Sequence, residues 1–149
     1  MEALTRLRAL LDRAGADYEL IAHSRPIRRT SDAAGMFDLH TAAPTLIVLA
    51  DGAPVAVILS AGRGRLDLAA ARVAARAESL VLADPATVRA ATGFEVGAVP
   101  LVGHGLPVVF DRRLLELAQV YGGSGDPLHT LRIAPADLER ISAPVGWLS

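Results

Sequence analysis

The chain has 149 residues, a length typical of one domain, and we expect residues 1–149 to form a single domain. It contains no cysteine, which excludes disulfides, thiolate metal sites and a cysteine nucleophile. Its formal net charge is −1, whereas proteins that coat duplex DNA are usually basic, so we expect no DNA partner.

The first predicted element is an amphipathic helix. Leu4, Leu7 and Leu11 recur at helical spacing, and Gly15 ends the pattern. This stretch lacks the long apolar run of a secretory signal, and the chain has no run of about 18 apolar residues. We therefore expect no membrane partner and a cytoplasmic location.

The next segments predict strands separated by a helical turn. Residues 18–21 read as a short strand, and residues 30–34 as a small-residue helical turn that the side chain of Thr30 or Asp32 caps. Residues 45–50 and 54–59 are apolar strands joined by Asp51-Gly52, which predicts an antiparallel hairpin.

The second half of the chain alternates helices, strands and loops. Asp84 and Pro85 predict the cap and first residue of a helix that ends at Gly93. The other predicted elements are a loop at 62–65, a helix at 66–77, a strand at 79–82, a glycine-rich connection at 97–105, a strand at 107–110, a turn or short helix at 111–115, strands at 118–121 and 129–133 around a loop at 122–126, and a helix that begins at 135.

The order of these elements indicates an α/β fold of the α+β type. Several connections are too short for parallel crossovers, so we expect a mixed, curved, largely antiparallel sheet with flanking helices. Asp111, at the end of a strand, is expected to fix a turn or loop rather than to act as a general base.

Common catalytic motifs are absent. The sequence has no phosphate-binding P-loop, no complete GxGxxG, no HExxH and no GxSxG. The four histidines lack metal-ligand spacing. We therefore expect neither a metal nor another cofactor.

Several segments, read in order, resemble the YbaK/ProX family, whose members are free-standing editing domains related to an insertion domain of bacterial prolyl-tRNA synthetases. The combination is more specific than any one segment, above all Thr-Gly-Phe-x-x-Gly-Ala-Val followed by a strand that ends in Asp. The matching segments are residues 30–34, 45–48, 65–68, 92–99, 108–111, 123–125 and 129–131.

This resemblance implies an aminoacyl-tRNA deacylase that edits in trans and hydrolyses the ester of a small mischarged amino acid. The implied partner is the aminoacylated 3′ end of a tRNA, with an aminoacyl-tRNA synthetase as a further candidate partner. A pocket of main-chain donors suits such chemistry, because an aminoacyl ester is already reactive and positioning with carbonyl polarisation can suffice.

The resemblance also indicates site residues. Thr30 and His129 match family positions near the pocket, although Thr30 equally suits a helix cap and His129 a surface strand. Glycines let the backbone approach a ligand, which makes Gly97 a candidate. The expected catalytic residues are Thr30, His129 and Gly97, and the expected substrate-binding residues are Pro44, Thr45, Ala98, Val99, Pro100, Gly103 and His104.

Arginines immediately before Thr30 are candidates for tRNA binding, since guanidinium groups bind phosphate in a bidentate manner. They are Arg25, Arg28 and Arg29, and a solvated loop face is the alternative role for each. Arg63 and Arg65 are further candidates for the same contact.

Two features depart from the family pattern. The family usually carries a lysine directly before the Thr-Leu of its first long strand, and this chain has Pro44 there and no lysine at all. Proline suits a strand start but provides neither a charge nor an N–H. In the glycine loop, the family's Gly-x-x-x-Pro is one residue shorter, from Gly97 to Pro100.

Pro44 motivates an alternative function, a catalytically inactive binding module that recognises tRNA ends, a nucleotide or a synthetase.

Overall fold

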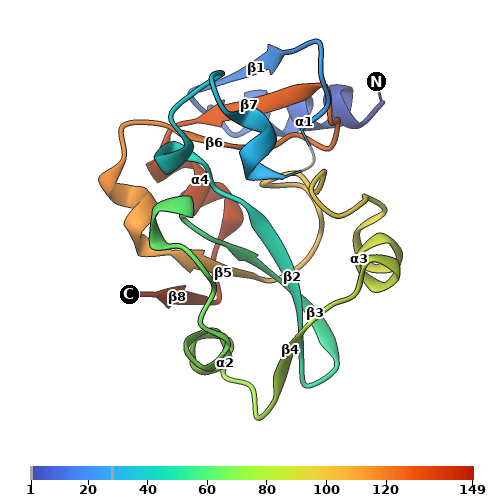
Figure 1. Cartoon of the computed structure of the whole chain (residues 1–149), viewed down its shortest axis with the longest axis vertical. Helices are drawn as coiled ribbons and strands as arrows, with labels where there is room; N and C mark the ends of the chain where they lie inside the picture. The colour runs from blue at the N-terminus through green and yellow to red at the C-terminus, as the bar shows by residue number, and fades with distance from the viewer. Residues whose placement is uncertain (1, 28) are drawn as a thin grey trace.

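Two β-sheets form the framework of the molecule (Figure 1). The computed structural model describes residues 2–27 and 29–149. One sheet is antiparallel, with strand order β1-β7-β6, and the other has the order β4-β2-β3-β5-β8. The strands are β1 (Tyr18–Ala22), β2 (Thr45–Ala50), β3 (Ala53–Ile58), β4 (Leu80–Leu82), β5 (Val108–Asp111), β6 (Val120–Gly123), β7 (His129–Ile133) and β8 (Gly146–Leu148).

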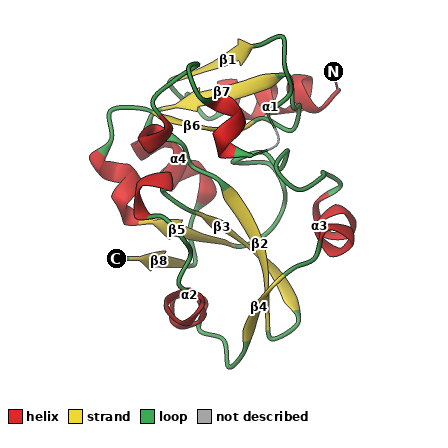
Figure 2. Ribbon diagram, in the orientation of Figure 1, coloured by secondary structure: helices red, strands yellow, loops and turns green. Residues whose placement is uncertain are grey.

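Helices lie around both sheets (Figure 2). α1 lies at the end of the molecule that holds the three-stranded sheet, whereas α2 contacts β4, β5 and β8. Within the described residues, no helix has the length and apolar character needed to cross a bilayer. The helices are α1 (Glu2–Arg13), α2 (Leu68–Ala75), α3 (Pro85–Thr92) and α4 (Pro135–Ser142), with 3-10 turns η1 (Thr30–Ala33), η2 (Leu39–Thr41), η3 (Ala61–Arg63) and η4 (Arg112–Glu116).

The mixed, largely antiparallel character of the fold is confirmed, but the expectation of one sheet is wrong. β1 pairs with β7, more than 100 residues later in the chain, and these strands separate with β6 into a second sheet. An isolated parallel bridge joins Ala42, shortly before β2, to Tyr121 of β6. Local periodicity identifies a strand but not its partner, because pairing depends on long-range contacts.

The main core is shared by the two sheets. It contains Leu11 of α1, Ile58 of β3, Phe110 of β5 and Leu131 of β7, all with 0 % exposure. Val57 and Val109 point to the other face of the five-stranded sheet and pack in a second cluster. The central strands are thus buried on both faces, which explains their nearly continuous apolar sequence.

Most local predictions are confirmed. The β2–β3 hairpin is antiparallel, and its turn residues Asp51 and Gly52 both have positive φ, at 50° and 83°. The Asp84 side chain caps α3 by accepting from the N–H of Thr87 at 2.7 Å. Gly93, with φ +79°, ends that helix.

Several boundaries differ from expectation. α2 begins at Leu68 rather than at residue 66, because the Asp67 carboxylate accepts from two amides of the first turn and fixes the N-cap there. β6 includes the first two glycines of the predicted 122–126 loop, and η3 occupies part of the predicted 62–65 loop. β8 is unexpected, and it is too short, at three residues, to show a sequence period.

Candidate active site

A pocket of about 310 Å³ opens where three segments meet. They are the stretch from η1 to the start of β2, the loop after α3, and the β6–β7 hairpin. Most lining residues are small or apolar, and most polar side chains come from the hairpin. The lining comprises Ile27, Arg29, Ala33, Phe37, residues 42–46, residues 96–99, residues 121–124, Asp126, His129 and Thr130.

The pocket brings together seven of the residues predicted from the sequence. These residues come from three separate parts of the chain. They are Arg29, Pro44, Thr45, Gly97, Ala98, Val99 and His129.

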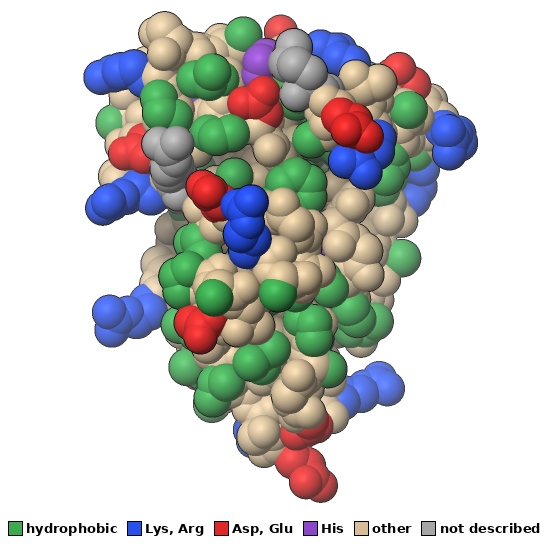
Figure 3. All heavy atoms as spheres, turned by 90° about the vertical axis from the view of Figure 1, so that its right-hand side faces the viewer, with side chains coloured by type: hydrophobic (Ala, Val, Ile, Leu, Met, Phe, Trp, Pro, Cys, Tyr) green, Lys and Arg blue, Asp and Glu red, His purple; other side chains and the backbone are tan. Residues whose placement is uncertain are grey.

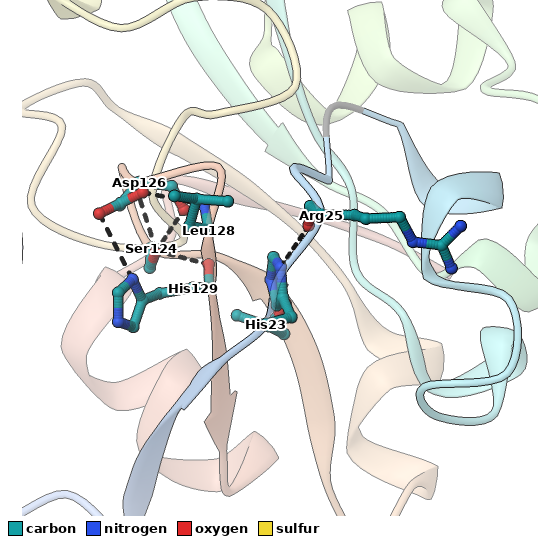
Figure 4. A network of polar contacts seen from close by, with 7 residues as sticks. His23, Arg25, Ser124, Asp126, Leu128 and His129 are labelled. Atoms are coloured by element: carbon teal, nitrogen blue, oxygen red, sulfur yellow. Dashed lines mark hydrogen bonds and ion pairs between the residues drawn. The ribbon is translucent and has the colours of Figure 1, made fainter.

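Four predicted residues do not line the pocket. Pro100 is buried behind it, Gly103 and His104 lie farther along the loop, and the Arg25 side chain extends away from His23 and His129 (Figure 4). Thr30 begins η1, but its side chain lies outside the described part of the structure, as does Arg28. The cap predicted at Asp32 is confirmed, because its Oδ2 accepts from the N–H of Arg29 at 3.3 Å.

His104 occupies an apolar setting away from the pocket. Its side chain is largely buried, and its Nδ1 accepts from the N–H of Leu106 at 3.1 Å. In the neutral ring Nε2 therefore carries the proton, and it has no partner among the described residues. Burial lowers the pKa of His104, which favours this neutral form.

Pro44 and Thr45 lead into β2 at the floor of the pocket. The Ala43 N–H donates to the Tyr121 carbonyl at 2.7 Å, and the Leu59 N–H donates to the Pro44 carbonyl at 3.0 Å. Both sheets therefore hold this segment. The Thr45 hydroxyl oxygen is buried without a hydrogen-bond partner in the described chain.

The loop after α3 rests directly on two glycines of β6. The Leu101 N–H donates to the Gly123 carbonyl at 3.0 Å. A Cβ on Gly123 would lie 2.1 Å from the Val99 oxygen, and one on Gly122 would lie 2.7 Å from Leu101 side-chain atoms. Only glycine permits this approach, which brings Val99 to the pocket wall.

Several main-chain donors of this loop are unpaired within the described part of the chain. Among the described residues, the N–H groups of Gly97 and Val99 form no hydrogen bond with the rest of the chain. Gly97 has φ +85°, a conformation that other residues rarely adopt. The loop therefore combines a glycine-dependent backbone with unpaired donors beside the pocket.

The β6–β7 hairpin positions His129 (Figure 4). The Ser124 hydroxyl lies 2.7 Å from the His129 carbonyl and 3.0 Å from the Asp126 carbonyl, and accepts from the Asp126 N–H at 3.2 Å. Asp126 Oδ1 accepts from the Leu128 N–H at 2.8 Å. Asp126 Oδ2 is 3.3 Å from His129 Nδ1, but the contact lacks hydrogen-bond alignment, so the imidazole retains donor and acceptor capacity.

An aromatic pair completes the wall. Phe37 and Tyr121 both line the pocket, and their rings stack at 4.5 Å between centroids with an interplanar angle of 12°. The stack holds the segment between η1 and η2 against β6 and forms one wall of the pocket.

Residues 24–141 match the aminoacyl-tRNA editing domain family, which is 118 of the 149 residues. The chain belongs to this family. The editing domain is similar to two solved structures over nearly its whole length. One is the hypothetical protein APE2540, with 28 % identity, a TM-score of 0.86, and coverage of 95 % of this chain and 97 % of that one.

The second similar structure is a candidate trans-editing enzyme for prolyl tRNA synthetase. It has 26 % identity and a TM-score of 0.81, with coverage of 97 % of this chain and 94 % of that one. The YbaK-like fold inferred from the sequence is therefore confirmed.

Several lining residues of the editing domain are not predicted from the sequence. Gly122 and Gly123 fall in the predicted 122–126 loop, although adjacent glycines in a strand indicate close approach of another backbone. Thr130 lies in the matching 129–131 segment, but one hydroxyl in an apolar strand is too common to indicate a site residue. Phe37 and Tyr121 meet only in the folded chain.

The buried ion pair of the editing domain lies elsewhere. Arg63 donates Nε and Nη2 hydrogen bonds to Asp111, both at 2.8 Å, and the Ser60 and Arg113 N–H groups donate to the same carboxylate. Burial alone would raise the pKa of Asp111, but these donors outweigh burial and hold it below its ordinary value. The loop-fixing role predicted for Asp111 is confirmed, and this pairing ties Arg63 to the protein rather than to a nucleic acid.

Proposed function

We propose that this editing domain hydrolyses, in trans, the ester between a small mischarged amino acid and the 3′ end of a tRNA. The observation that carries the proposal is the pocket, with its mostly small or apolar lining and the unpaired main-chain N–H groups of Gly97 and Val99. The similar structure described as a candidate trans-editing enzyme supports action by a free-standing domain. Such a reaction takes place in the cytoplasm, where charged tRNA is found.

In this proposal, the ester carbonyl of the substrate lies against the glycine loop. The N–H groups of Gly97 and Val99 would donate to the ester oxygen as it gains negative charge, which lowers the barrier to attack by water. Pro44, Thr45 and Ala98 would form the contact surface for the amino acid. Pro100, Gly103 and His104 would act indirectly, by shaping the loop.

His129 is the proposed proton-handling side chain of the hairpin. Its ring lines the pocket beside Asp126, and both are about a quarter exposed or less. Histidine exchanges protons near neutral pH, so it suits transfer to the leaving 3′-oxygen. Thr30 would assist from η1.

Size would select the substrate. A pocket bounded by Ala33, Ala42, Ala43 and the Phe37–Tyr121 stack admits a small side chain and excludes a bulky one. Steric exclusion is an effective sieve, whereas recognition of one missing methylene gives only about 10–200-fold selectivity.

The tRNA end would be bound by local positive charge. Arg29 lines the pocket and Arg25 is exposed on the segment before it, which supports binding of terminal phosphates by these two side chains, with Arg28 as a further candidate. Because the net charge is −1, we expect a modest salt dependence from a few phosphate contacts rather than from a broad basic face.

The test is release of amino acid from a panel of mischarged tRNAs that spans side-chain size. We expect hydrolysis only for the smallest side chains, and a loss of about 100-fold for His129→Ala, within the range for removal of a general acid or base. Failure to hydrolyse any member of the panel would contradict the proposal.

The alternative function is a binding module without activity. Pro44 favours it, since the pocket has no ammonium where the family usually has one. Measurable binding of tRNA ends, a nucleotide or a synthetase without turnover would support this alternative.

A further inference from the structure

His23 and Thr130 form a hydrogen-bonded pair on one face of the three-stranded sheet. In the register of β1 and β7, Ile21 lies opposite Thr130, and the His23 N–H donates to the Leu128 carbonyl at 2.9 Å. His23 and Thr130 are therefore diagonal neighbours, close enough for side-chain contact. His23 Nε2 lies 3.1 Å from Thr130 Oγ1.

The second ring nitrogen of His23 decides the direction of this hydrogen bond. His23 Nδ1 lies 2.6 Å from the Arg25 carbonyl oxygen (Figure 4), and a carbonyl oxygen can only accept. Nδ1 therefore carries the proton. In the neutral ring Nε2 is then an acceptor, so the Thr130 hydroxyl must donate to it.

Thr130 connects this pair to the pocket. It lines the pocket and is 5 % exposed, whereas His23 is half-buried and outside the lining. With its proton directed at His23, Thr130 Oγ1 presents lone pairs to other donors. The arrangement leads from the pocket, through a hydroxyl, to an imidazole that can exchange protons with solvent.

We propose that Thr130 and His23 relay the proton of the attacking water, with His23 as the general base; this deepens the proposed function and rests on it. As the water oxygen bonds to the ester carbonyl carbon, its proton passes to Thr130 Oγ1, and the Thr130 proton passes to His23 Nε2. When the bond to the ribose 3′-oxygen breaks, His129 donates a proton to that oxygen, His23 releases the proton taken from the water to solvent, and His129 takes up one proton from solvent. The products are the free amino acid and a tRNA with its 3′-hydroxyl.

Neighbouring charges bear on the pH dependence of such a relay. On β7, the strand that pairs with β1, the imidazole is that of His129. The Arg132 side chain on the same strand forms ion pairs with Asp17 and Glu19. Besides His23, the charged and titratable groups on residues 17–25 and on the β6–β7 hairpin are Asp17, Tyr18, Glu19, Arg25, Tyr121, Asp126, His129 and Arg132.

The test is a single-turnover pH profile on the mischarged tRNA that the wild-type protein hydrolyses fastest. We expect the wild-type rate to rise with pH, tenfold per unit, to a plateau. The His23→Gln side chain can still accept a hydrogen bond from Thr130 but cannot take up a proton. The rate of this variant should therefore be about 100-fold lower and should no longer rise with pH, which means that the pH-dependent limb of the profile is lost. Thr130→Val should do the same, and Thr130→Ser should restore the limb and most of the rate.

Controls separate the relay from a structural role. The exposed His40 is outside the pocket, and His40→Gln should leave the profile unchanged. His129→Gln should lower the rate but keep the limb. Binding of a non-hydrolysable tRNA with an amide-linked amino acid should stay within about threefold in His23→Gln and Thr130→Val, as expected of groups that act in the transition state.

Two results would overturn the relay. The first is a rate that still rises with pH in His23→Gln. The second is weaker binding of the analogue in both His23→Gln and Thr130→Val with an unchanged single-turnover rate. Either result would make the pair a structural contact and would leave the proposed function intact. A wild-type protein inactive on every tRNA would overturn the proposed function and the relay together.

Discussion

The five-stranded sheet and the β6–β7 hairpin use opposite means to hold their shape. Strands β2, β3 and β5 bury apolar side chains on both faces, and their one buried carboxylate, Asp111, is fully paired. The hairpin and the loop it supports rely on glycines and on side-chain hydrogen bonds to the backbone. On the side of the molecule seen in Figure 3, exposed apolar side chains gather over the lower half, and charged groups lie mostly around them.

This difference separates stability from function. Side-chain packing in the sheet determines how firmly the domain folds, because buried apolar area is the main stabilising contribution. Main-chain placement in the hairpin and loop determines where the N–H groups lie. Substitutions in the two regions should therefore change different measurements.

The largest effect is expected from Asp111→Asn. Removing one charge of a buried pair leaves the Arg63 guanidinium, 19 % exposed, without its carboxylate, so we expect a loss of about 3 kcal/mol in the free energy of unfolding. Urea denaturation measures this change. Activity of the protein that remains folded should be nearly unchanged, since neither residue lines the pocket.

The difference in stability between the wild-type protein and Asp111→Asn should depend on pH. Because the pKa of Asp111 is lowered in the folded state, its contribution is complete above the unfolded value of about 3.9 and is lost as pH falls through the folded pKa. The wild-type advantage over Asp111→Asn should shrink below about pH 4. Asp84→Asn is the matched control, since an exposed asparagine caps a helix as well as aspartate. An equal loss in both variants would contradict the comparison.

Gly123→Ala should have the next largest effect, mainly on activity. The new Cβ would meet the Val99 oxygen at 2.1 Å, so the loop must move away from β6 and carry its N–H groups with it. We expect about 100-fold slower deacylation, the size seen when one oxyanion donor is lost. Gly62→Ala, whose Cβ would have only ordinary contacts of 3.6 Å or more, should leave the rate unchanged. A normal rate in Gly123→Ala would remove the loop from the mechanism.

The elements of the fold were largely predictable because their signals are local. The Asp51-Gly52 turn, the Asp84 cap and the apolar strands 45–50 and 54–59 each depend on neighbours within a few residues. The division into two sheets was not, because it depends on β1 meeting β7.

The site was predictable only in part, for the same reason. Gly97 and Pro44 carry conformational meaning in the sequence, and both line the pocket. Thr130 and His23 have no motif in common, and their contact follows from the strand register. His104 had the right residue type in a glycine loop, but Val99 is the last residue of that loop to line the pocket, and Gly103 lies near Leu10 of α1.

A smaller effect is expected from Ser124→Ala, within the hairpin itself. The variant loses the hydroxyl contacts with the His129 and Asp126 carbonyls, so we expect about 1 kcal/mol of destabilisation, as for one hydrogen bond. Looser placement of His129 should slow deacylation by about 5–10-fold, since each 1.4 kcal/mol of barrier is tenfold. Ser124→Thr keeps the hydroxyl and serves as the comparison, with single-turnover kinetics as the measurement. The loss in the free energy of unfolding and the rise in the activation free energy of deacylation can be compared directly. A larger loss of stability than rise in the activation barrier would contradict a functional role for the hairpin.

The smallest effect is expected from Pro44→Lys, which introduces the ammonium that the family usually carries. If the Gly97 and Val99 N–H groups polarise the ester carbonyl, the new cation adds to donors already in place, and we expect less than about a tenfold increase in rate. Pro44→Ala separates loss of the proline ring from gain of the charge, and both variants keep the main-chain carbonyl that accepts from Leu59. An increase of about 1,000-fold or more in Pro44→Lys alone would show that main-chain donors are insufficient, and would favour a binding module as the natural role of this chain.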